Sequence, residues 1–262
     1  MQDISTGLET MSREHEQRIH IGVGGWSYPP WRGVFYPSDL VQRRELEYAS
    51  RRLTSIEINS TFYGLQKPAS FAKWHAETPA EFVFSLKAPR FVTGRRRLAD
   101  AGESIRRFFD SGVLLLQDKL GPVNWQLGPE KAFDAMDLEA FFTLLPRKLE
   151  GRAIRHAIEV RHPSFLVPGF PQLAQRHGIS VVLAGDSEYP AIADDSASVV
   201  YARLMGTSRK WKKGYPQRDL ENWALQARQW ADEGREVFLY VIGGFKERNP
   251  AAAMALIELT KI

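Results

Sequence analysis

The sequence predicts an α/β protein that folds as a single (β/α)8 barrel of the TIM type, and three observations support this. Eight short runs rich in Val, Ile, Leu and aromatic residues alternate with helix-type segments, an order typical of a parallel sheet. Eight strands close such a barrel, and the 262 residues match its usual length of about 250. No G-x-G-x-x-G follows the first run, which disfavours an open sheet that binds a dinucleotide.

Each expected strand ends near Gly, Pro or a polar cluster. The eight strands are expected at residues 19–25, 55–60, 82–88, 123–128, 156–162, 180–186, 199–206 and 237–244. Helices are expected at residues 42–53, 68–77, 98–110, 134–149, 169–178, 218–233 and 250–261. Pro68 and Pro250 suit the first turn of a helix, and Asn249 suits an N-cap. Because only residues 187–198 separate the sixth and seventh strands, we expect the sixth helix to be short or missing.

The composition predicts one barrel domain, residues 19–262, behind a polar N-terminal tail, residues 1–18, which we expect to be flexible. The tail lacks the apolar stretch of a secretory signal, and no apolar run is long enough to cross a membrane. We therefore expect a cytoplasmic protein with no membrane partner. The absence of cysteine excludes disulfides, thiolate metal sites and cysteine nucleophiles. The net charge of +4 does not by itself identify a partner, and the oligomeric state stays open.

Five of the expected strands carry polar residues at alternate positions. Alternate residues of a strand point to opposite faces, and the face under the helices must be apolar. The polar positions therefore point into the barrel, and several lie near the C-terminal strand ends where barrel active sites form. The main ones are Glu57, Asn59, Lys87, Gln126, Glu159, Arg161 and Arg203. Buried charges must pair or face a wet cavity, so a structural ion-pair network and a polar pocket are both possible, and the two are compatible.

Five motifs carry a resemblance to a known family. They occur in the order GWSYPPWRGVFYP (25–37), EINSTFYGL (57–65), FSLKAPR (84–90), KLGPVNWQLGP (119–129) and EVRHPSF (159–165). The chain resembles the YecE-like family, also called domain of unknown function 72, over roughly residues 21–260. The resemblance implies a TIM-like barrel with a pocket but no established reaction. Gly94 stands where many members carry His, and Gly243-Gly244-Phe245-Lys246 replaces an Asn-Asn-Asp type stretch.

Two basic loops follow expected strands and so belong to the site face. Loop three, residues 87–97, holds five cations, and loop seven, residues 203–218, holds six, with Trp211 and Tyr215 among them; neither holds an acid. Barrels often bind phosphate at loops seven and eight, whereas cations interleaved with aromatics also suit a nucleic acid. A pair of solvated loops that only aid solubility is the third interpretation.

Aromatic side chains mark the first two loops of the site face, at Trp26, Tyr28, Trp31, Phe62 and Tyr63. They suit either stacking on a ring-bearing ligand or a cap packed over the core. A metal is not expected, because His162 alone of six histidines is well placed and neighbouring cations compete for the carboxylates. No cofactor is expected.

These observations lead to a hypothesis of a barrel that binds a small anionic, phosphate-bearing ligand, with no reaction assigned. Glu57 or Glu159 would move a proton, and Lys87 could act as a Schiff-base amine if desolvated. The expected ligand-binding residues are Asn59, Tyr63, Arg90, Gln126, Arg161, His162, Arg203 and Tyr240. Two alternatives stay open: a nucleic-acid-binding protein, with or without nuclease chemistry, that uses loops three and seven, and a non-catalytic scaffold.

Overall fold

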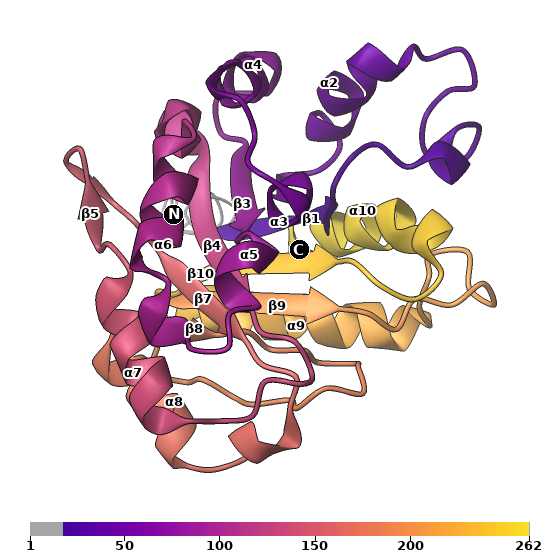
Figure 1. Ribbon diagram of the computed structural model, residues 1–262. Coiled ribbons are helices and arrows are strands. Elements are labelled where there is room, and N and C mark those ends of the chain that lie inside the picture. The colour runs from indigo at the N-terminus through magenta and orange to yellow at the C-terminus, as the bar shows by residue number, and fades with distance from the viewer. Residues whose placement is uncertain (1–17, 262) are drawn as a thin grey trace, which may run out of the picture.

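Eight parallel strands form one curled sheet in the computed structural model, which describes residues 18–261 (Figure 1). In sheet order these strands are β8 (Ser180–Val181), β7 (His156–Glu159), β4 (Leu120–Gln126), β3 (Val83–Lys87), β2 (Ser55–Ile58), β1 (Ile19–Gly24), β10 (Glu236–Val241) and β9 (Val199–Leu204). A single parallel bridge between Leu183 and Ala202 joins the two edges, β8 and β9. The expected eight-stranded barrel is therefore confirmed, with one weakly paired seam.

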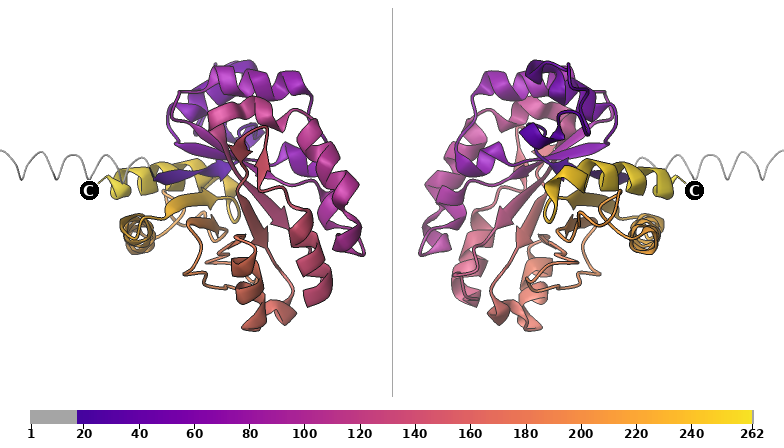
Figure 2. Two further views of the ribbon diagram at one scale, coloured as in Figure 1. Left: turned by 90° about the vertical axis from the view of Figure 1, so that its left-hand side faces the viewer. Right: turned by 90° about the vertical axis from the view of Figure 1, so that its right-hand side faces the viewer.

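Helices surround the sheet on its outer side, and α9 and α10 lie side by side (Figure 2). The α-helices are α2 (Glu45–Ser50), α3 (Ser60–Tyr63), α4 (Pro68–Glu77), α5 (Arg90–Thr93), α6 (Gly102–Asp110), α7 (Ala135–Leu144), α8 (Gly169–Arg176), α9 (Gln217–Asp232) and α10 (Asn249–Thr260). Short 3-10 helices lie at Pro29–Trp31, Gln42–Arg44, Leu98–Asp100, Val113–Lys119, Pro163–Phe165 and Lys246–Arg248. None of the helices in residues 18–261 is long and apolar enough to cross a membrane.

The sequence expectations for the elements need three corrections. The helix expected at 134–149 ends at Leu144, because Pro146 cannot continue it, and β5 (Lys148–Leu149) then pairs antiparallel with β6 (Arg152–Ala153). The sixth strand is only two residues long, β8. Asn249 is the first residue of α10 rather than its N-cap, which is Arg248.

The missing sixth helix is confirmed, since the segment between β8 and β9 in the described chain contains no helix. The expected flexible tail, residues 1–18, lies outside the described residues except for Arg18. The expected division into a tail and a barrel stays a prediction.

The strand parity divides the molecule into two packing regions. Outward-facing residues such as Ile56, Leu86 and Trp125 are fully buried in the main hydrophobic core between sheet and helices. Inward-facing Tyr201, Phe238 and Tyr240 form a separate apolar layer inside the barrel, completed by Ala157, Val182 and Val199. The hydroxyl of Tyr240 contacts Ser55 Oγ and Ser85 Oγ, both at 2.7 Å, which fixes this layer across the barrel.

An ionic cluster lies below this apolar layer, at the N-terminal end of the barrel. Glu236 Oε1 lies 3.1 Å from His20 Nε2, and Glu236 also pairs with Arg155. Burial alone would raise the pKa of Glu236, but these two partners lower it to about 2. The ring of Phe238 stacks on His20 with centroids 4.6 Å apart. The lower end of the barrel interior is therefore filled with paired charges and aromatic rings.

Candidate functional site

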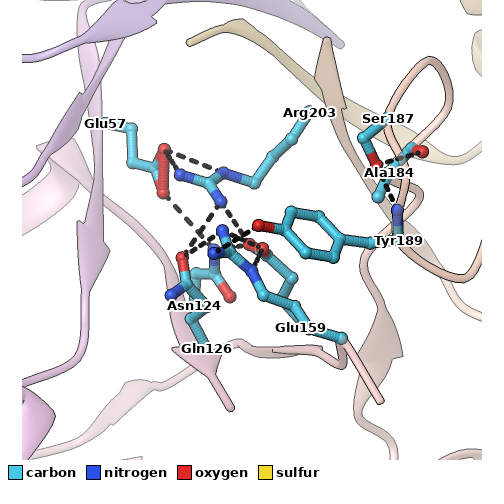
Figure 3. A network of polar contacts seen from close by, with 9 residues as sticks. Glu57, Asn124, Gln126, Glu159, Ala184, Ser187, Tyr189 and Arg203 are labelled. Carbon is cyan, nitrogen blue, oxygen red and sulfur yellow. Dashed lines mark hydrogen bonds and ion pairs between the residues drawn. The ribbon is translucent and has the colours of Figure 1, made fainter. Parts of the chain in front are cut away.

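A network of charged side chains lies above the apolar layer, and Arg203 on β9 is its centre (Figure 3). Only 3% of the surface of Arg203 is exposed. Its guanidinium donates to Glu57 Oε2 at 3.2 Å, to Gln126 Oε1 at 3.3 Å, and to Glu159. Asn124 Nδ2 lies between the two acids, 3.4 Å from Glu57 Oε1 and 3.3 Å from Glu159 Oε2. Four strands that are distant in sequence therefore meet through one cation.

Arg161, two residues beyond the end of β7, carries the network toward the surface. Its Nε donates to Glu159 Oε1 at 2.8 Å and its Nη2 to Gln126 Oε1 at 2.9 Å. Its guanidinium carbon lies 4.2 Å from the ring centroid of Tyr189, and Nη1 donates to the Tyr189 hydroxyl at 3.3 Å. Tyr189 was not expected from the sequence, because it lies in the irregular segment after β8 where no strand or helix pattern places a side chain.

The two interior carboxylates are neutralised by arginine. Burial by itself would raise the pKa of Glu159, but the positive charges of Arg203 and Arg161 hold that pKa below its ordinary value. Glu57 and Glu159 are both fully buried. Glu159 therefore stays ionised at neutral pH and works as a fixed acceptor that holds the arginines in place.

Lys87, at the end of β3, is the third cation facing this interior. No hydrogen bond or ion pair of its ammonium is found within residues 18–261, and its Nζ lies 4.1 Å from the ring centroid of Phe62. Burial and then the positive charge of Arg203 lower the pKa of Lys87 to about 8. Two carboxylates are set against the cations of Arg161, Arg203 and Lys87, so the cluster carries a surplus of one positive charge.

A pocket of about 680 Å³ opens above the network at the C-terminal ends of the strands. Its floor includes Lys87, Arg161 and Arg203, and its wall includes the aromatic residues Trp26, Tyr28, Trp31, Tyr63, Trp74 and Tyr189. The indole of Trp31 is buried and donates to the Lys246 carbonyl at 2.8 Å. Trp26 meets Trp74 edge to face at 5.3 Å. The aromatics of the first loop therefore pack over the core and also line the pocket.

The structure brings most of the expected site residues together. Those that line the pocket are Asn59, Tyr63, Lys87, Arg161 and Arg203. Those beneath it, within the hydrogen-bonded network, are Glu57, Gln126 and Glu159.

Three expected ligand-binding residues are not at the pocket wall. Arg90 is exposed on the short helix α5, which turns it outward. His162 Nδ1 accepts from the Ser164 amide at 3.2 Å and so caps the turn Pro163–Phe165. Tyr240 faces inward as expected but lies one layer lower, held by Ser55 and Ser85.

The backbone amides of loop seven already have an anionic partner within the chain. Asp186 accepts from the amides of Met205 at 2.5 Å and Gly206 at 2.9 Å, and from the Tyr215 hydroxyl at 2.5 Å. A phosphate bound by these amides would have to displace the carboxylate of Asp186. Across residues 18–261, no group of three or more His, Asp or Glu side chains is placed to hold a metal ion.

Comparison with known proteins identifies the family. The model of the family described as "Protein of unknown function DUF72" matches residues 20–262, so the chain belongs to this family. The UPF0759 protein YecE of Escherichia coli is 27% identical over 161 residues, which is 62% of this chain and 55% of YecE. The chain thus matches only about half the length of that protein.

Two further relatives match over nearly their whole length. The UPF0759 protein YunF of Bacillus subtilis is 23% identical across 92% of this chain and 95% of YunF. The crystal structure of a DUF72 family protein from Thermotoga maritima superposes with a TM-score of 0.73 at 20% identity, covering 93% of this chain and 98% of that one. This likeness shows the shared barrel fold.

Proposed function

We propose that this DUF72 protein binds a small anion, carrying a phosphate or a carboxylate, in the pocket at the C-terminal end of the barrel. The observation that carries the proposal is the surplus cation: Lys87 faces the pocket and its ammonium makes no hydrogen bond or ion pair within residues 18–261, while Arg161 and Arg203 are already paired with carboxylates. A desolvated, unpaired ammonium favours an anion, since an opposite charge nearby stabilises its protonated form.

The pocket suits a ligand of metabolite size. Its volume of about 680 Å³ falls in the range of small-molecule sites, roughly 300–1,000 Å³. Aromatic walls with a few converging polar groups are also typical of such sites. Asn59 and Tyr63 would contact the ligand directly, whereas Glu57, Gln126 and Glu159 would hold the arginines in position.

The proposal is tested by titrating inorganic phosphate into the protein and measuring binding by calorimetry. Lys87→Met is expected to weaken binding about tenfold or more, because it removes a partly desolvated charge partner worth more than ~1 kcal/mol. Lys73→Met, which removes an exposed lysine of α4, makes the same change in net charge and is expected to leave affinity unaltered. Equal affinities in all three proteins would contradict the proposal.

The pH dependence of this binding has a defined sign. A bound anion raises the pKa of Lys87 above its value of about 8, so phosphate affinity is expected to fall as pH rises through that value. Titrations at pH 7 and pH 9.5 measure the difference, and Lys87→Met should lose this fall and keep only the change that comes from the ionisation of phosphate itself.

A second candidate, nucleic-acid binding, is favoured by one observation on loop seven. Trp211 is 37% exposed, and Lys210 Nζ lies 4.9 Å from its ring centroid, among the exposed cations Arg209, Lys212 and Lys213. An exposed ring among cations suits stacking on a base. Binding of a single-stranded oligonucleotide that falls steeply with salt and with Trp211→Ala would support this candidate. Absence of both phosphate and oligonucleotide binding would favour the scaffold.

A further inference from the structure

Lys87 is partly buried and Lys119 is buried, and they differ in how their ammonium groups are satisfied. Lys119 is 4% exposed, and its Nζ donates to the carbonyls of His75 at 2.6 Å and Thr78 at 2.7 Å and contacts Thr78 Oγ1 at 3.1 Å. All three of its donor hydrogens have acceptors, as a structural cation requires. Lys87 has none of these contacts, and it faces a pocket rather than the backbone.

An ammonium placed in this way is unfavourable for stability, so a chemical use of the amine accounts for it better than a structural one. We infer that Lys87 is a nucleophilic amine that forms a Schiff base with the carbonyl carbon of an anionic ligand, a 2-oxo acid or a phosphorylated aldehyde. This inference rests on the proposed function, since the pocket must first hold the anion.

The charged groups around Lys87 favour its neutral form. Arg203 on β9 and Arg161 after β7 oppose the protonated amine, while Glu57 on β2 and Glu159 on β7 favour it less strongly than burial disfavours it. With a pKa of about 8, roughly one Lys87 in ten is neutral at pH 7, against about one in a few thousand for an ordinary lysine. Only the neutral amine carries the lone pair needed for attack.

The covalent step balances without any further reactant. The Lys87 lone pair attacks the carbonyl carbon, an N–C bond forms, and a proton passes from nitrogen to oxygen to give a carbinolamine. Loss of the hydroxyl together with the remaining N–H proton, as water, breaks the C–O bond and leaves the C=N double bond. Its nitrogen takes up a proton from solvent, equal to the one that Lys87 releases on becoming neutral. The protonated imine carries the same charge as the original ammonium, so the ion pairs of Arg161 and Arg203 beneath it need not rearrange.

Reductive trapping tests the inference. The full-length protein is incubated at pH 7 with glyoxylate or with glyceraldehyde 3-phosphate in the presence of sodium cyanoborohydride, and the reduced adduct is located by peptide mass spectrometry. Modification is expected at Lys87, faster than at surface lysines by on the order of a hundredfold because of its larger neutral fraction. The rate should rise with pH with a midpoint above 8, because the bound anion raises the pKa of Lys87 from about 8. The two probes distinguish carboxylate from phosphate ligands.

Two variants separate this chemistry from simple anion binding. Lys87→Arg keeps the positive charge but removes the amine, so it should abolish the adduct while phosphate still binds. Lys73→Arg, at an exposed lysine of α4 outside the pocket, should leave the Lys87 adduct unchanged. If phosphate binds but labelling spreads over surface lysines with none at Lys87, the inference is overturned and the proposed function stands. If the wild type neither binds phosphate nor is trapped, both fail.

Discussion

Lys87 and Arg203 face the same interior but differ in their partners. Arg203 is fully paired, whereas Lys87 is not and lowers the stability of the fold. Arg203 has both acids as partners, so removing it would leave Glu57 without an ion-pair partner in the barrel and Glu159 with Arg161 alone. Lys87 loses hydration and gains contact with the face of Phe62, while the attraction of Glu57 and Glu159 is weaker than the penalty of burial. Its folded-state pKa of about 8 lies below the ordinary value of 10.5, so the folded state disfavours the protonated form.

Replacing Lys87 by Met is therefore expected to stabilise the protein at pH 7, by on the order of 1 kcal/mol after allowance for its partial exposure. The penalty is fully present below pH 8. Between pH 8 and 10.5 the unfolded chain binds the proton and the folded chain does not, so wild-type stability rises with pH and the advantage of the variant fades. Urea unfolding at pH 7 and pH 10 measures both effects.

The matched control is Lys119→Met, which should destabilise the fold because it leaves the carbonyls of His75 and Thr78 without their donor. A Lys87→Met protein that is less stable than the wild type at pH 7 would show that Lys87 is structural.

Strand parity predicted from the sequence which residues face the interior, but not what each one contacts there. Parity fixes the face of the sheet for Glu57, Glu159 and Tyr240, and all three do point inward. It carries no information on depth, which is why Tyr240 lies below the pocket rather than in its wall. Arg90 is the first residue of the short helix α5 and His162 is the N-cap of the turn Pro163–Phe165, and a strand pattern does not extend to either position.

At the scale of the elements, β1 depends on a close approach that only glycine permits. Gly22 pairs with Ser55 across the β1–β2 ladder, and a Cβ at Gly22 would overlap the Ser55 carbonyl. The positions of the strands were predictable because each is a compact apolar run, but their lengths were not, since β8 has only two residues. The end of α7 was not, because the apolar positions continue past Leu144 and Pro146 overrides them.

Gly22→Ala is expected to destabilise the protein by about 2–3 kcal/mol or more, because the added methyl pushes β1 away from β2. Gly169→Ala is the control, since a Cβ there has open space in the first turn of α8. Thermal unfolding of both variants tests this, and similar losses in the two would contradict the packing argument.

At the scale of the whole molecule, the barrel is closed unevenly. Strands β10 and β9 pair along six residues, whereas the β8–β9 seam depends on the bridge at Leu183, whose amide donates to Tyr201 and whose carbonyl accepts from Arg203, both at 2.9 Å. No helix connects β8 to β9 in the described chain, so this pair of strands has no crossover helix of its own. The spacing of residues 187–198 predicted the missing helix, but it gave no sign of how weakly β8 pairs.

Hydrogen exchange is expected to reveal the seam. The amides of Leu183 and Arg203 should exchange about tenfold or more faster than those of β10, because opening the seam breaks few hydrogen bonds. Exchange measured by nuclear magnetic resonance under native conditions resolves these positions. Equal protection at the seam and in β10 would mean that the barrel opens only by global unfolding.

The layer of Tyr201, Phe238 and Tyr240, backed by the Glu236 cluster, makes the barrel a cup rather than a tube. A ligand that enters the pocket at the C-terminal end of the barrel must therefore also leave at that end. If the pocket holds the proposed anion, a second anion could enter only after the first has left past Tyr63, 71% of whose surface is exposed, so two small anions should compete for the site.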